Sequence, residues 1–294
     1  MRGFIIKSIS GFFYVLSDDD NKIYKCNVRG KIRNINITPI CGDEVEFEHD
    51  AESDFSSILN VYPRKNSLVR PPIANVDIAL IVMSTIKPTF DSYLVDKLIV
   101  QSRKEDIEPI IVLSKCEFIT EDIQTLLDNY KLAGYKVFEV SSHQNINIDV
   151  LLEYIKGKRC VMCGQSAVGK SSLINSLNSN LHRDIGDFSE KLGRGKHTTR
   201  EVELIDIGGA YVADSPGFSS LDIKIELVDF ARAFKDFEVL ANKCKYSTCL
   251  HDNEPGCAIK KAVEDGIIDI RRYNNYLHLK SEIKDGKHVW VKKW

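Results

Sequence analysis

Residues 164–172 read Gly164-Gln165-Ser166-Ala167-Val168-Gly169-Lys170-Ser171-Ser172 and match the pattern G-x-x-x-x-G-K-[ST] at every defined position. The apolar, β-branched run 159–163 comes directly before them, and the helical pattern 173–177 follows. A strand, a glycine-rich loop and a helix in this order form a phosphate-binding loop, whose backbone N–H groups surround phosphates at the helix N-terminus. We expect all nine residues to bind a nucleotide, with Lys170 on the β- and γ-phosphates and Ser171 on Mg²⁺.

The sequence on both sides of this loop alternates between strands and helices. Apolar, β-branched runs at 78–83, 109–113, 135–140 and 159–163 are separated by helical patterns at 92–103, 121–132 and 149–156, and two further strands are expected at 202–207 and 210–213. This alternation predicts an α/β domain with a parallel sheet covered by helices on both faces. Ligands of such sheets bind at the carboxyl ends of strands, so the loops after these runs are the candidate sites.

Two loops after the phosphate-binding loop could complete a magnesium site. The strand 210–213 ends in Asp214-Ser215-Pro216-Gly217, where Asp214 could hold the Mg²⁺ shell and the Gly217 amide could contact the γ-phosphate, although such a sequence is often only a turn. The basic, glycine-rich stretch 191–200 is either a solvated surface loop or a switch that closes over the γ-phosphate. As a switch it would supply a threonine to Mg²⁺, Thr199 or its neighbour Thr198, with Thr199 favoured.

A base-reading loop is expected after the strand 109–113. Nucleotide-binding G domains read guanine with Asn-Lys-x-Asp at a strand end, and this chain has Ser114-Lys115-Cys116-Glu117. The Glu117 carboxylate would accept from the ring N–H and amino group of guanine, and the Lys115 stem would lie along the base. Ser114 lacks the side-chain amide of the usual asparagine, so we expect the loop to lose the support that this amide gives to the site. After another strand, Ser141 and Ser142 are candidates for contact with the base oxygen.

These base-reading loops precede the phosphate-binding loop, whereas they follow it in ordinary GTPases. The order is that of a circularly permuted G domain, which is possible because the termini of a domain are exposed and often close together.

The two ends of the chain predict two further domains. Residues 4–62 read as about five short alternating strands, typical of a small OB-type β-barrel with or without a binding role. Near the other end, C-x₄-C-x-H-x₅-C supplies four soft ligands within 14 residues, the pattern of a closed structural zinc site: Cys244, Cys249, His251 and Cys257. We therefore expect a multidomain chain with a barrel at 1–66, a permuted GTPase domain at 67–222 and a mostly helical zinc-binding domain at 223–294. Cys160 and Cys163 lie on a predicted strand and are interpreted as core.

Composition bounds the function classes. The 294 residues are 43% hydrophobic and 28% charged, which excludes extended disorder, and the longest apolar run, residues 78–83, is far below the roughly 18 residues of a membrane span. A cytoplasmic protein is expected. The formal net charge is -2, yet the segment 271–294 carries seven basic and two acidic residues with interleaved Tyr273, Tyr276, Trp290 and Trp294. This segment suits RNA, although a solvated basic tail and partial core packing remain alternatives.

The leading barrel, the permuted order of loops and three motifs together resemble the bacterial family of GTPases that depend on the small ribosomal subunit, RsgA or YjeQ. The motifs are the phosphate-binding loop, Gly193-Arg194-Gly195-Lys196-His197-Thr198-Thr199-Arg200 and Asp214-Ser215-Pro216-Gly217-Phe218. The resemblance covers essentially the whole chain. It implies a GTPase that acts in late maturation of the small ribosomal subunit, is stimulated by that subunit and grips its rRNA with the barrel and zinc domain. Expected partners are GTP or GDP and the subunit, with no membrane and a monomeric state; expected cofactors are one structural Zn²⁺, and Mg²⁺ with GTP.

Hydrolysis needs a group other than the usual glutamine. In signalling GTPases a glutamine after Asp-x-x-Gly orients the attacking water, and here that position is Phe218. His197 is the candidate replacement, a role that the resemblance also implies, whereas an RNA contact or a surface position is the alternative for this histidine. Two other functions stay open at this point: a nucleotide-gated RNA-binding module with negligible turnover, and an ATPase that uses the same loop.

Overall fold

The computed structural model describes residues 1–9, 11–28, 37–49, 55–184, 202–214 and 225–285. The chain forms two compact units, one of residues 1–78, 149–162 and 174–216, the other of residues 79–148, 163–173 and 217–294. The predicted loop 191–200, the residues Gly217 and Phe218, and both tryptophans lie outside the described residues. The predicted domain boundaries near residues 66 and 222 stay predictions.

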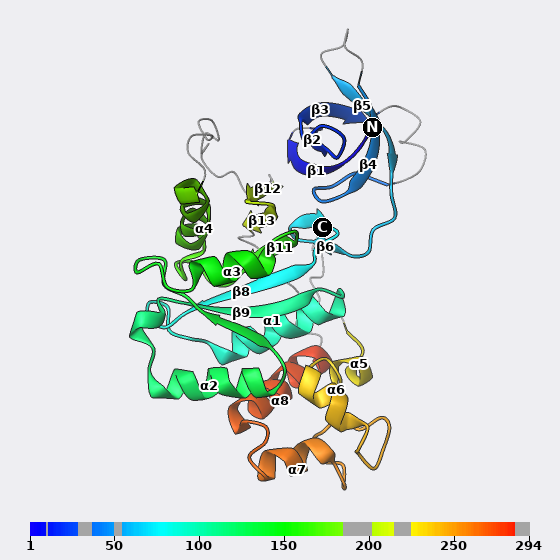
Figure 1. Cartoon of the computed structure of the whole chain (residues 1–294). Helices are drawn as coiled ribbons and strands as arrows, with labels where there is room; N and C mark the ends of the chain where they lie inside the picture. The colour runs from blue at the N-terminus through cyan, green and yellow to red at the C-terminus, as the bar shows by residue number, and fades with distance from the viewer. Residues whose placement is uncertain (10, 29–36, 50–54, 185–201, 215–224, 286–294) are drawn as a thin grey trace. The chain divides into compact units, whose positions relative to one another are not determined.

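The first unit begins with a closed barrel of five strands (Figure 1). β1 (Arg2–Ile9) pairs antiparallel with β2 (Phe12–Ser17) and β4 (Glu44–Glu48), β2 with β3 (Ile23–Val28), and β5 (Ser56–Val61) closes the circuit against β3 and β4. Alternate residues of β2 are buried, as a half-buried strand requires. The interior is filled by Ile5, Phe13, Val15, Cys26, Val45, Phe47 and Ile58. The predicted barrel is confirmed.

The same unit contains part of an α/β sheet. β11 (Arg159–Cys163) pairs in parallel with β13 (Ala210–Asp214), and β12 (Val202–Ile207) pairs antiparallel with β13. β12 also pairs with β1 of the barrel, where Lys7 and Glu203 form a 2.8 Å ion pair. The unit is completed by a short hairpin, β6 (Ser67–Val69) and β7 (Pro72–Ala74), by α3 (Ile148–Ile155) and by most of α4 (Lys170–Asp184). The predicted strands and the helix near 149–156 are confirmed.

The second unit is built on strands in the order β10-β9-β8. These are β8 (Ile78–Ser84), β9 (Glu108–Ser114) and β10 (Lys136–Glu139), with β9 and β10 in parallel. All seven residues of β8 are buried, which explains its continuous apolar run. α1 (Ser92–Lys104) packs on β9 and α2 (Glu121–Leu132) on β10. Asp91 and Thr120 cap these two helices by accepting from backbone N–H groups in the first turn.

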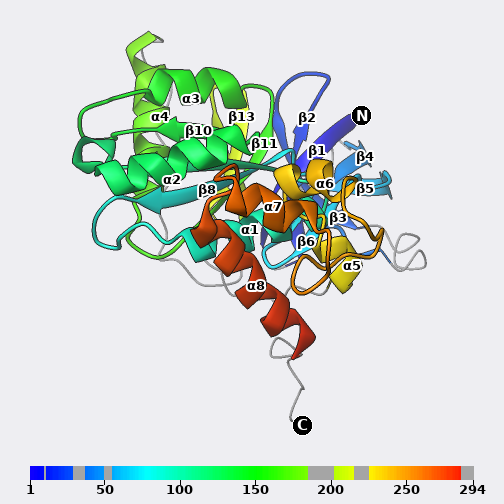
Figure 2. The same cartoon turned by 90° about the horizontal axis from the view of Figure 1, so that it is seen from below.

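The C-terminal helices of this unit are short apart from the last. They are α5 (Leu227–Phe230), α6 (Lys235–Ala241), α7 (Ala258–Glu264) and α8 (Ile270–Lys284). α8 packs against α1 and α5, and α6 packs against α7 (Figure 2). The rings of Phe230 and Tyr276 are stacked, with centroids 4.9 Å apart, and Phe234 and Phe237 complete the aromatic core.

Several basic residues of the C-terminal segment are engaged in ion pairs. Arg272 is 3% exposed and donates to both carboxylate oxygens of Asp236, at 2.7 and 3.2 Å, while its Nε lies 3.8 Å from Asp96 Oδ1. Arg271 pairs with Asp269 and Asp122, and Lys280 pairs with Asp252. Counting charges within 271–294 missed these acidic partners because all of them lie earlier in the chain. Three of the seven basic residues are therefore engaged in ion pairs within the fold.

The buried pair gives a stability prediction. Arg272→Ala leaves the carboxylates of Asp236 and Asp96 buried without their cation, so the free energy of unfolding should fall by about 3–5 kcal/mol. Arg271→Ala is the matched control, since its ion pairs are partly exposed and removing them should cost less than about 1 kcal/mol. Urea denaturation of the two variants and the unsubstituted protein measures the difference. Equal losses of unfolding free energy in the two variants would contradict the larger contribution expected of the buried ion pair.

Candidate active site and metal centre

The phosphate-binding loop has the predicted form of a strand, a glycine-rich turn and a helix. β11 leads into Gly164, whose φ is +138° and whose hypothetical Cβ would lie 2.1 Å from the Val82 carbonyl oxygen. No side chain fits there, and Gly169 also has a positive φ of +101°. α4 begins at Lys170, and the Leu173 N–H donates to the Gly169 carbonyl at 2.8 Å. The loop therefore presents the positive end of a helix to its surroundings.

The side chains of this loop differ in what surrounds them. Lys170 Nζ donates to the carbonyl oxygens of Gly164, at 3.0 Å, and Gln165, at 2.8 Å, so its ammonium folds back over the loop. Val168 is buried as part of the core. The small polar or apolar side chains that face solvent are Ser166, Ala167, Ser171 and Ser172.

The predicted base-reading loop is hydrogen-bonded to the phosphate-binding loop. Ser114, at the end of β9, is 4% exposed, and its hydroxyl donates to the Val168 carbonyl oxygen. Lys115 lies in the left-handed region, and its ammonium donates to the carbonyls of Ile86, Lys87 and, at 3.5 Å, Ala167. The expectation that Ser114 leaves the loop without a brace was therefore wrong, because the shorter hydroxyl reaches the neighbouring backbone directly.

Glu117 lies one turn further, in the short 3-10 helix η2 (Cys116–Phe118). Its Oε2 is buried and has no hydrogen-bond partner among the described residues. A buried carboxylate oxygen without a donor is costly, so this atom is suited to accept from a bound molecule. The base-reading role of Glu117 stays a prediction.

The end of β10 lies beside this loop. The Cys116 N–H donates to the Val140 carbonyl at 3.1 Å, which joins the two strand ends. Ser141 is fully buried, and its hydroxyl accepts from the Gln144 N–H at 3.1 Å. The side chain of Ser141 thus shapes its own turn, whereas Ser142 is only half-buried.

Two residues that sequence reasoning missed support both loops. Thr85 is 3% exposed and donates through Oγ1 to the Lys115 carbonyl at 2.8 Å. Asp91 caps α1 through Oδ1 and accepts from Gln165 Nε2 through Oδ2 at 3.5 Å. Asp91 carried a readable signal, an aspartate directly before a helical pattern, whereas Thr85 carried none.

The remaining predicted nucleotide residues are described only in part. Asp214 ends β13 opposite Met162 of β11, and its Oδ1 is buried with no hydrogen-bond partner among the described residues. An acidic oxygen in this state is suited to a cation or its water shell. His197, Thr198, Thr199 and Gly217 lie outside the described residues.

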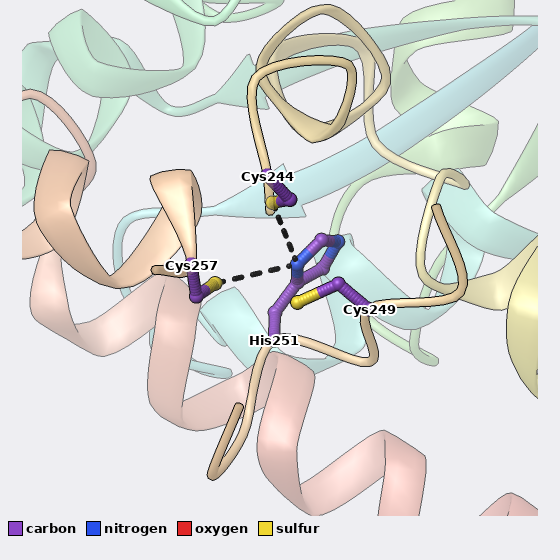
Figure 3. A group of neighbouring side chains, drawn as sticks. All are labelled: Cys244, Cys249, His251 and Cys257. Carbon is purple, nitrogen blue, oxygen red and sulfur yellow. Dashed lines mark hydrogen bonds between the residues drawn. The ribbon is translucent and has the colours of Figure 1, made fainter. Parts of the chain in front are cut away.

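The four predicted metal ligands come together in one cluster (Figure 3). One ligand atom from each of Cys244, Cys249, His251 and Cys257 lies within 4.8 Å of the others. His251 Nδ1 is 3.7 Å from Cys244 Sγ and 3.5 Å from Cys257 Sγ, close to the separation of about 3.5 Å between nitrogen and sulfur ligands of a tetrahedral zinc ion. The set therefore fits a closed metal site.

The surroundings of the cluster orient its ligands. His251 is fully buried, and its Nε2 lies 3.1 Å from the Ala231 carbonyl, which fixes the proton on Nε2 and leaves Nδ1 free to bind a metal. Burial also lowers the pKa of His251, which favours the neutral ring. The Glu254 carboxylate accepts from the N–H groups of Leu250 and Asp252, both at 2.9 Å, and holds the turn between the ligands.

The second cysteine pair behaves as predicted. Cys160 and Cys163 are both fully buried on β11, and the Cys163 thiol donates to the Leu80 carbonyl. Burial raises the pKa of Cys160 to about 12. Both are core residues.

Comparison with known proteins shows the family of the chain. A model of the RsgA GTPase family matches residues 61–224, and a model of the RsgA N-terminal domain matches residues 2–55. The chain belongs to the RsgA GTPase family. Members of this family are GTP-hydrolysing enzymes, so the chain is a GTPase. Within its described residues no helix has the length and apolar character to cross a membrane.

Similar proteins cover the whole chain. The small ribosomal subunit biogenesis GTPase RsgA 2 of Listeria innocua is 45% identical over 98% of this chain and 99% of its own length. RsgA of a Geobacillus species is 44% identical over 97% of this chain and 98% of its own length. Among solved structures, YloQ, a circularly permuted GTPase, has a TM-score of 0.83 at 36% identity over 98% of this chain and 96% of its own. YjeQ from Thermotoga maritima has a TM-score of 0.80 at 33% identity, over 96% of this chain and 98% of its own. The predicted RsgA resemblance and the permuted order of the fold are confirmed.

The close approach at Gly164 gives a prediction for this RsgA chain. Gly164→Ala should lower the free energy of unfolding by about 3 kcal/mol or more, because it adds a clash with Val82 to an unfavourable φ. Gly157→Ala is the control: it has a positive φ of +72° but open space around it, so about 1–2 kcal/mol is expected. Thermal denaturation of both variants checks this. A smaller loss at Gly164 than at Gly157 would contradict the contact.

Proposed function

We propose that this chain is a Mg²⁺-dependent GTPase that acts in late maturation of the small ribosomal subunit and is stimulated by that subunit. The observation that carries the proposal is the hydrogen bond from Ser114 to Val168, which holds a base-reading loop against a phosphate-binding loop. The printed names of the relatives, small ribosomal subunit biogenesis GTPases, support the assignment of the subunit as partner.

The nucleotide would lie across the two joined loops. The helix N-terminus and Lys170 would hold the β- and γ-phosphates, with the remaining loop residues close to the phosphates through their backbone. Guanine would donate to the unpartnered Oε2 of Glu117, while the Lys115 stem, Cys116 and the backbone of Ser141 and Ser142 border the base. The buried, unpartnered oxygen supports guanine over adenine, because adenine offers no ring N–H at that edge.

The Mg²⁺ site would be formed by Ser171, Asp214 and a threonine, Thr199 or Thr198. The unpartnered Oδ1 of Asp214 fits this role. When bound, Mg²⁺ would neutralise charge on the phosphate oxygens. Gly217 would contact the γ-phosphate through its amide.

His197 would position the attacking water. Phe218 has no group that can orient water, so a neutral imidazole carried over the γ-phosphate supplies the missing hydrogen bond. Because Phe218 cannot supply this hydrogen bond, turnover should be slow until the ribosomal subunit helps to position His197.

The remaining proposals concern the outer domains. The barrel and the zinc-binding domain would contact rRNA, and the structure leaves fewer basic side chains for this than the sequence suggested, because Arg271, Arg272 and Lys280 are paired. The Cys₃His cluster would hold one structural Zn²⁺. We also propose a cytoplasmic monomer with the three domains placed at 1–66, 67–222 and 223–294.

One set of measurements tests the enzymatic proposal. GDP and GTP should bind more tightly than ATP, and GTP hydrolysis should rise at least about tenfold when small ribosomal subunits are added. His197→Ala should remove most of the stimulated turnover and leave GDP affinity unchanged. Tight GTP-dependent docking on subunits without turnover would support a nucleotide-gated RNA-binding module instead, and unchanged stimulation in the variant would exclude His197.

Metal content tests the zinc proposal. The purified chain should carry one zinc ion, and Cys257→Ala should lose it, because three remaining ligands no longer close the site. Cys160→Ala is the matched control, a buried cysteine outside the cluster that should keep full zinc content. Elemental analysis by mass spectrometry gives the stoichiometry. Zinc retained at one per chain in the Cys257 variant would contradict the ligand set.

A further inference from the structure

The loop between β8 and α1 contacts both halves of the proposed nucleotide site. At its start, Thr85 donates to the Lys115 carbonyl, and the carbonyls of Ile86 and Lys87 accept from the Lys115 ammonium. At its end, Asp91 accepts from Gln165 of the phosphate-binding loop. This loop belongs to none of the predicted nucleotide-binding motifs. Its start nevertheless contacts the base-reading loop, and its end, at the first turn of α1, contacts the phosphate-binding loop.

The first two turns of α1 are held from the other side by α8. Asn275 Nδ2 donates to Ser92 Oγ at 3.1 Å and to Asp96 Oδ2 at 2.7 Å. Asp96 is fully buried and also accepts from the Tyr130 hydroxyl at 3.0 Å. Ser92 directly follows Asp91, so α8 is hydrogen-bonded to α1 beside the residue that contacts the phosphate-binding loop.

The same helix is tied to the metal centre. The Tyr273 hydroxyl donates to the carbonyl of His251, a metal ligand, and the Tyr276 hydroxyl donates to the carbonyl of Leu250, each at 2.7 Å. Asn275 and Tyr276 are adjacent in α8, so one short stretch of helix reaches both α1 and the loop that carries the metal ligands. Hydrogen bonds, together with the α8 backbone and the peptide bond between Asp91 and Ser92, therefore connect the cluster to the phosphate-binding loop.

We propose that metal occupancy of the Cys₃His cluster and nucleotide affinity are coupled through α1, with Asp91 and Asn275 as positioning residues. The inference rests on the proposed nucleotide and zinc sites. With zinc bound, the ligand loop holds α8, α8 holds the first turn of α1, and Asp91 keeps Gln165 in place. Without zinc, this support is lost and the phosphate-binding loop is less well ordered for the nucleotide. Because coupling between binding sites is reciprocal, GDP should strengthen zinc binding by the same factor.

The test is the affinity of a fluorescent GDP analogue for the full chain with zinc and after removal of zinc by a chelator. GDP affinity should fall about fivefold or more when zinc is removed, the lower range of coupling between sites. Asp91→Ser keeps the helix cap, since serine caps as well as aspartate, but its shorter side chain has no second oxygen to accept from Gln165. With zinc bound, this variant should bind GDP as weakly as the zinc-free protein, and zinc removal should change its affinity less than about twofold.

Two further variants separate this coupling from general stability. Asn275→Ala leaves every metal ligand in place and should bind one zinc but show weakened GDP affinity. Arg103→Ala removes the 2.6 Å ion pair with Glu238 at the far end of α1 and should keep the full zinc dependence. Equal GDP affinity with and without zinc, or an unchanged zinc dependence in Asp91→Ser, would overturn the coupling alone. Absence of GDP binding or of zinc in every sample would contradict the proposed sites themselves.

Discussion

The hydrogen bond from the Ser114 hydroxyl to the Val168 carbonyl joins residues that are 54 positions apart. The proposed nucleotide site needs its base-reading and phosphate-binding loops at a fixed separation, and this bond supplies that constraint whichever loop comes first along the chain. The permuted order is tolerated for this reason: binding depends on where the strand ends lie, and β9 and the loop after β11 bring them together. The left-handed backbone of Lys115 turns the chain directly after this bond, and the missing side chain at Gly164 lets the start of the phosphate-binding loop approach the Val82 carbonyl of β8.

The C-terminal region solves a different problem, because its helices are too short to form a large core of their own. Its interior combines the aromatic cluster around Tyr276 with the four candidate metal ligands and the buried Arg272. A closed Cys₃His site can supply folding free energy that such a segment cannot gain from apolar burial. The aromatic rings also shield the cluster, since Phe237 meets the His251 ring edge to face at 5.9 Å.

Local patterns predicted the elements well and their partners poorly. The strands, the helices at 92–103, 121–132 and 149–156, the phosphate-binding loop and the Cys₃His cluster are encoded in short stretches, so spacing and periodicity were enough to find them. The pairing of β1 with β12, the support from Thr85 and the ion pairs of Arg271 with Asp122 and of Arg272 with Asp236 depend on residues far away in the chain. The error over Ser114 has the same origin: comparing side chains one for one ignored how close the opposite backbone would be.

The buried network around Arg272 shows why α8 docks in one position on α1. Two carboxylates and one guanidinium are removed from water, and burial raises the pKa of Asp96 to about 7. Apolar side chains of similar volume often give equal or greater stability than buried ions. They could, however, slide along the helix by part of a turn with little loss, whereas Arg272 must meet Asp236 and approach Asp96 at once, and Asn275 must reach Ser92 and Asp96 together. The polar network thus fixes the register of α8 on α1, and with it the position of the helix that begins beside the phosphate-binding loop.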